Sequence, residues 1–121
     1  MRSEESEEAL QIFSKQFFDH ALPADCVRYH VPNGGHRSKA VAGKMKASGV
    51  LPGVPDWTFH YMGKTYFLEL KSARGQLSKE QIEFKNAVQA QGLKWMLARN
   101  VTEIELALSV FGIPTSARVA A

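Results

Sequence analysis

The stretch "GVPDWTFHYMGKTYFLELKSARGQLS", residues 53–78, decides the fold. It contains two runs rich in β-forming residues, "WTFHYM" and "KTYFLELKS", separated only by Gly63 and the residues beside it. Two such runs joined by a short glycine-containing turn predict a β-hairpin. The hairpin is largely apolar, yet Asp56 begins its first strand and Glu69 and Lys71 lie within the second. These three charged residues require an explanation.

Alternation of side chains along a strand places Glu69 and Lys71 on one face, together with Phe67. Their positions are separated by roughly 6.6 Å along the strand. Asp56 starts the neighbouring strand, so we expect it opposite Glu69, with the three charged groups converging at a sheet edge. The other face, which we expect to pack on the core, takes Tyr66, Leu68 and Leu70.

The rest of the chain predicts helices and two further strands around this hairpin. Helices are expected over 4–20, capped by Ser3 or Ser6, over 78–92, where Ser78 and Gln81 form a capping box, and over 102–112. Strands are expected over 26–31 and 94–100, and a helical turn around 38–47. The order α-β-β-β-α-β predicts an α/β fold with a mixed sheet of about four strands flanked by helices.

Length and composition indicate one folded domain over residues 1–121, with a frayed tail at 114–121. Of the 121 residues, 45% are hydrophobic and 22% charged, which excludes a disordered chain. Cys26 is the single cysteine, so no internal disulfide forms, and we expect it to be a small core residue. The acidic start, "MRSEESEEAL", contains no apolar signal segment. These features favour a cytoplasmic protein.

Charge is distributed unevenly along the chain, although its net value is only +3. Between Cys26 and Pro55 there is no Asp or Glu, whereas the first eight residues carry four glutamates. A basic segment of this kind attracts polyanions, but it is also typical of a solvated loop. The candidates for phosphate contacts in this segment are Asn33, Arg37, Lys39, Lys44 and Lys46.

The pair Asp56 and Glu69 admits two interpretations from the residues alone. With Lys71 it forms a surface salt bridge across strands, or it binds a divalent cation. Two neighbouring carboxylates repel unless a cation lies between them, and Mg²⁺ accepts one or two carboxylates together with waters and a phosphate. The four histidines share no metal-binding spacing, so a zinc site is not expected.

"PD" at 55–56 followed by "ELK" at 69–71 resembles the PD-(D/E)XK nuclease motif. Longer stretches resemble the VRR-NUC family, the virus-type replication-repair nucleases, and in particular its small stand-alone members from phages and bacteria. The resemblance covers about residues 7–112 and implies a restriction-endonuclease-like core. The stretches that carry it are "HVPNGGHR", "KASGVLPGVPDW", "FLELKSARGQLSKEQIEF" and "GLKWMLARN".

The resemblance implies a role for each matched residue. Asp56 and Glu69 are similar to the family's metal ligands for Mg²⁺ or Mn²⁺, with the carbonyl of Leu70 as a third, and Lys71 is similar to its catalytic lysine. Gln81 resembles the glutamine that faces the site from the following helix. Glu7 best matches the acidic residue of the first helix, and Glu8 is the alternative.

By the same resemblance, we expect a Mg²⁺- or Mn²⁺-dependent endonuclease that hydrolyses phosphodiesters in DNA repair, encoded by a bacterium or phage. The expected substrate is branched DNA such as a Holliday junction, cut by a homodimer. The alternative is a non-catalytic nucleic-acid-binding module with a nuclease fold. The apolar helix at 102–112 supplies either a dimer interface or a face that packs on the sheet.

Overall fold

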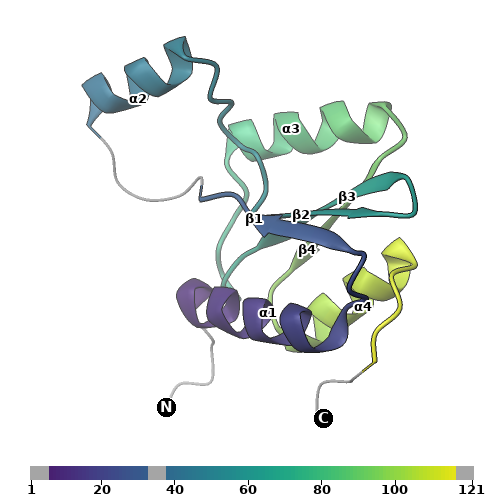
Figure 1. The fold of residues 1–121 in the computed structure, drawn as a ribbon. Helices are drawn as coiled ribbons and strands as arrows, with labels where there is room; N and C mark the ends of the chain where they lie inside the picture. The colour runs from purple at the N-terminus through teal and green to yellow at the C-terminus, as the bar shows by residue number, and fades with distance from the viewer. Residues whose placement is uncertain (1–5, 33–37, 117–121) are drawn as a thin grey trace.

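In the computed structural model, which describes residues 6–32 and 38–116, a four-stranded sheet lies between two layers of helices (Figure 1). Helix α3 covers one face of the sheet, and α1 and α4 lie against the other. The elements, in chain order, are α1 (Glu7–Ala21), β1 (Val27–His30), α2 (Lys39–Ala47), β2 (Trp57–Tyr61), β3 (Lys64–Leu70), α3 (Lys79–Ala90), β4 (Lys94–Ala98) and α4 (Val101–Phe111).

The strands follow the order β1-β2-β3-β4, which confirms the predicted α/β fold with a mixed sheet. Strand β2 pairs antiparallel with both β1 and β3, and β4 pairs parallel to β3 after the α3 crossover. The predicted hairpin turn consists of Met62 and Gly63, whose φ angles are 52° and 78°. Two consecutive residues with positive φ match the twist of the paired strands and allow the tightest connection.

The core lies between the sheet and the α1/α4 layer. Phe18 packs edge-on against Trp57 and Phe59, with ring centroids 4.9 and 5.1 Å apart. Tyr66, Leu68 and Leu70 are buried on this face, as their alternation predicted. On the opposite face, Phe67 meets Phe84 of α3 edge-on at 5.2 Å. Helix α3 covers this face less completely, since none of its own residues is buried.

Helix boundaries follow the caps. The predicted helix over 4–20 begins at Glu7, because the side chain of Ser6 accepts a hydrogen bond from Ala9 N and Ser6 itself is extended. Asn100 caps α4 by accepting from Glu103 N. Gly112 ends α4 in the left-handed conformation, with φ 79°.

Two segments differ from expectation. Where the sequence predicted a helical turn around 38–47, the structure has the nine-residue helix α2. None of its residues is buried, and it projects from the body of the fold (Figure 1). Within the tail predicted to fray, 114–121, the described residues 114–116 lie against the end of α1, where Ser116 N donates to Ala21 O at 2.9 Å. Residues 117–121 lie outside the described part of the chain. In the described ranges, every helix is too short or too polar to cross a bilayer.

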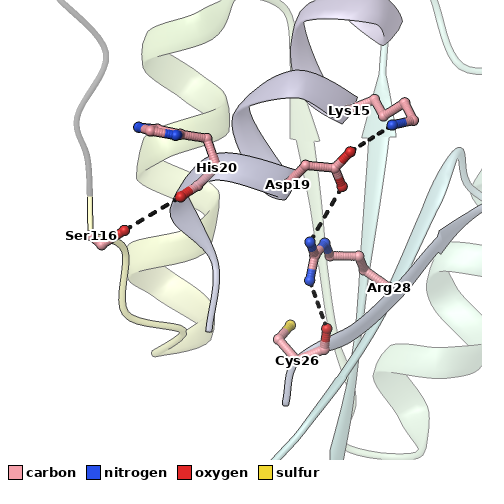
Figure 2. A network of polar contacts seen from close by, with 6 residues as sticks. All are labelled: Lys15, Asp19, His20, Cys26, Arg28 and Ser116. Carbon is pink, nitrogen blue, oxygen red and sulfur yellow. Dashed lines mark hydrogen bonds and ion pairs between the residues drawn. The ribbon is translucent and has the colours of Figure 1, made fainter. Parts of the chain in front are cut away.

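A polar network joins α1 to β1 (Figure 2). Arg28 donates to Asp19 Oδ1 at 3.3 Å and to Cys26 O at 3.0 Å, and Lys15 bonds the second oxygen of Asp19. The hydrogen bond from Lys15 is the main cause that lowers the pKa of Asp19. Cys26 is buried in the core as predicted, and desolvation raises the pKa of its thiol. Burial with a raised pKa argues against a nucleophilic role for this cysteine.

Candidate active site

Asp56 is fixed where β1, β2 and β3 meet. Its Oδ2 accepts a hydrogen bond of 2.7 Å from the backbone N–H of Leu70. Its own carbonyl accepts from Val31 N and from His30 Nδ1, both at 2.8 Å. The preceding Pro55 is fully buried, which restricts the backbone conformation just before β2. Asp56 therefore lies beside the end of β3, opposite Glu69, as the sequence predicted.

Glu69 is a buried carboxyl, with only 3% of its surface exposed. Gln81 Nε2 donates to Glu69 Oε2 at 3.1 Å. The other amide atom, Oε1, accepts from the backbone N–H of Ser78 at 2.8 Å. This second bond is half of the capping box that begins α3, so the helix cap also fixes which amide atom faces Glu69.

The nearby Lys71 ammonium does not offset the burial of Glu69 and the neighbouring charge of Asp56. Desolvation, followed by the charge of Asp56 and a hydrogen bond with it, raises the pKa of Glu69 to about 9. The ammonium of Lys71 acts in the opposite direction, and the charge of Glu7 adds to the increase in pKa. A cation at this point would favour the ionised form of both carboxyls.

The remaining predicted residues separate into those that reach the site and those that do not. Glu7, in the first turn of α1, lines the same cleft as Asp56 and Glu69, whereas Glu8 does not. Lys71 is half-buried and lines the cleft directly after β3. The charged groups meet where β2 begins and β3 ends, at one end of the two central strands.

The cleft has a volume of about 410 Å³ and opens between the strand ends, the start of α3 and α2. Helix α2 contributes Lys46 to its wall, so one of the predicted phosphate contacts lies at the site. Lys39 and Lys44 are exposed on α2 and do not line the cleft. Asn33 and Arg37 lie outside the described residues.

The donor atoms fit a hard divalent cation. Asp56 and Glu69 supply carboxylate oxygens, and the N–H of Leu70 points toward Asp56. In an extended strand the N–H and C=O of one residue point to the same side, which puts the Leu70 carbonyl on the side of β3 where Asp56 lies. In the described ranges, no three His, Cys, Asp or Glu side chains are grouped as a metal cage. Two carboxylates with waters suit Mg²⁺ or Mn²⁺ better than Zn²⁺.

Two residues that shape the site were not predicted as site residues. Gly53, with φ 87°, lies so close to α3 that a Cβ there would be 2.3 Å from Glu80 O. The glycine-rich approach to Asp56 was a signal for a special backbone, although not for this contact. Arg99 binds the turn after Lys71, and nothing in the sequence around it indicated this role.

A comparison of the chain with models of protein families, with curated proteins and with solved structures finds no match. The VRR-NUC resemblance therefore stays a prediction that rests on the motif residues.

Proposed function

We propose that this protein is a Mg²⁺- or Mn²⁺-dependent DNA endonuclease of the VRR-NUC type. The observation that carries the proposal is the buried Glu69 beside Asp56, next to Lys71, in an open cleft with a basic wall. A surface salt bridge with Lys71 does not explain this arrangement. An exposed ion pair does not require a buried carboxyl, and placing that carboxyl beside a second one is unfavourable. A cation and a phosphate together complete such a site.

The chain's own groups have distinct tasks in phosphodiester hydrolysis. Asp56 and Glu69 would hold the cation, which would supply charge stabilisation at the scissile phosphate and lower the pKa of a water for in-line attack. Gln81 keeps the Glu69 carboxylate oriented toward the cleft. Lys71 offsets the negative charge that develops on the phosphate oxygens and orients the attacking water. Glu7 lines the same cleft, where its carboxylate oxygens can accept hydrogen bonds from water.

The basic side of the cleft favours a nucleic acid as the substrate. Helix α2 carries Lys39, Lys44 and Lys46 and no acidic residue, and it stands away from the core, where a sugar-phosphate backbone can reach it (Figure 1). Lysines in such a position bind phosphates without reading sequence. A cytoplasmic location, in a bacterium or from a phage, is part of this proposal.

Branched DNA as substrate and a homodimer as assembly complete the proposal. Among the residues that the structure describes there is one cleft lined by Asp56, Glu69 and Lys71, whereas resolving a four-way junction needs two cuts related by a two-fold axis. Helix α4 packs on the sheet through Ile104, Leu108 and Phe111, yet it leaves Leu106 56% and Val110 41% exposed. These two apolar side chains are available for a second copy.

The test is cleavage of four-way junction, flap and linear duplex DNA by the purified protein, with Mg²⁺ or Mn²⁺ and with EDTA. Metal-dependent cleavage that is lost in Asp56→Asn and Glu69→Gln, with folding retained, supports the proposal. Binding without cleavage under every metal condition favours the alternative, a non-catalytic module. Light scattering decides the assembly, and a monomer that cuts duplex as well as junctions would contradict only the junction part.

A further inference from the structure

Arg99 holds the turn that follows Lys71. It comes directly after β4, and its Nη1 donates to Ser72 O at 2.8 Å and to Gly75 O at 2.6 Å, with a longer contact of 3.4 Å to Ala73 O. Its backbone N–H donates to Glu103 Oε1 at 2.8 Å, which fixes its position at the start of α4. A planar guanidinium that is always charged suits several carbonyl oxygens at once.

The turn held by Arg99 folds back onto Lys71. Gly75 N donates to Ser72 O at 3.2 Å, which closes the turn. A Cβ placed at Gly75 would lie 3.3 Å from Lys71 Cδ and 3.1 Å from Ser72 Oγ. The backbone of Gly75 therefore packs against the aliphatic stem of Lys71. The backbone N–H of Lys71 is held as well, by Ala98 O at 3.1 Å on β4.

We propose that Arg99 is a positioning residue that sets where the Lys71 ammonium lies in the cleft. The inference rests on the proposed function, since it assigns Arg99 a task in the same reaction. A lysine has a long flexible stem, and a stem packed against a fixed turn visits fewer positions. Because small displacements of a reacting group are costly in rate, the turn that Arg99 fixes contributes to turnover without touching the substrate.

Arg28 provides a matched control. It is also half-buried and also donates to a backbone carbonyl, that of Cys26, but it joins α1 to β1 (Figure 2). It does not line the cleft. The same substitution at Arg28 measures how much stability is lost when an arginine that bonds a backbone carbonyl is replaced by lysine. A change seen only at Arg99 then reflects the turn beside Lys71.

The experiment compares Arg99→Lys with Arg28→Lys in single-turnover DNA cleavage, in DNA binding and in amide hydrogen exchange. We expect the cleavage rate of Arg99→Lys to fall about ten- to hundredfold, while its DNA affinity stays within about twofold of the wild type. Exchange at the Gly75 amide should accelerate. Arg28→Lys should lower the melting temperature and leave both the cleavage rate and Gly75 exchange unchanged.

Chemical rescue separates positioning from general stability. Guanidinium ions, far below the concentrations that unfold proteins, should restore part of the activity of Arg99→Ala and none of that of Lys71→Ala. An Arg99→Lys variant that cleaves as fast as the wild type would overturn the inference, and so would an equal loss of rate in Arg28→Lys. If the wild-type protein cleaves no DNA with any metal, the proposed function and the inference that rests on it are both overturned. If the wild type cleaves and only the Arg99 outcomes fail, the inference alone is overturned.

Discussion

Gln81 donates from Nε2 to the Glu69 carboxyl at 3.1 Å while its Oε1 caps the first turn of α3. One side chain therefore links the stability of a helix end to the orientation of the buried acid. The two tasks are separable by substitution, because a glutamate at the same position satisfies a capping box but cannot donate to Glu69.

Gln81→Ala and Gln81→Glu should differ in stability, but both should lose DNA-cleavage activity. Gln81→Ala removes half of the cap and should lower the free energy of unfolding by about 1 kcal/mol. Gln81→Glu should retain most of that stability. Both should cleave DNA at least about tenfold more slowly, since neither donates a hydrogen bond to Glu69. Denaturant unfolding and single-turnover kinetics measure the two effects, and wild-type turnover in Gln81→Glu would contradict this assignment.

The stability of the metal-free protein should fall as pH rises because of Glu69. Its pKa is about 9 in the folded chain, compared with an ordinary 4.5. A carboxyl whose pKa is raised by folding contributes stability that is fully present below pH 4.5 and is lost as pH rises through 9. Glu69→Gln cannot titrate and is the control. The melting temperature of the wild type should decline relative to that of Glu69→Gln between pH 5 and 9, and Mg²⁺ or Mn²⁺ should oppose the decline. If the melting temperatures of the wild type and Glu69→Gln change in parallel with pH, this role of Glu69 is refuted.

Gly53→Ala should destabilise the protein more than Gly49→Ala. Both glycines have positive φ, at 87° and 102°, so both alanines carry backbone strain. Only at Gly53 does the new methyl group meet backbone, 2.3 Å from Glu80 O, whereas nothing lies within 4 Å at Gly49. We expect a further loss of about 2 kcal/mol at Gly53, together with reduced cleavage, because α3 and Gln81 must shift. Equal melting temperatures would show that the contact is easily relieved.

Lys71 and the lysines of α2 should affect different steps. Lys71→Ala should slow cleavage and leave DNA affinity largely intact. Removing Lys39, Lys44 and Lys46 together should weaken binding and lower the salt-dependence slope by about 2 to 3. Lys64→Ala, which removes one charge at the opposite end of β3, should leave both unchanged. Affinity measured against salt concentration separates these cases, and normal binding by the triple variant would refute a role for α2.

Local patterns in the sequence determined most of the architecture. The alternation in β3 predicted which side chains face the core and which share a face with Glu69, because period-two alternation is a property of any extended strand. Ser78 and Gln81 begin α3 through hydrogen bonds that span three residues, so local sequence was sufficient to find this cap. Asn100, which the sequence placed in the last strand, instead caps α4. Asp56, Glu69 and Lys71 stood out because charges are unusual in an apolar hairpin.

Only the tertiary structure decided how the site is held. The burial of Glu69 and its raised pKa arise from α3 and Asp56 together, and neither is visible in the residues next to Glu69. The sequence favoured Glu7 over Glu8, and only the structure shows that Glu7 lines the cleft while Glu8 does not. Arg99 reaches the turn after Lys71 only because β4 pairs parallel to β3, which brings the ends of both strands to one side. Such contacts join distant parts of the chain, and no local pattern encodes them.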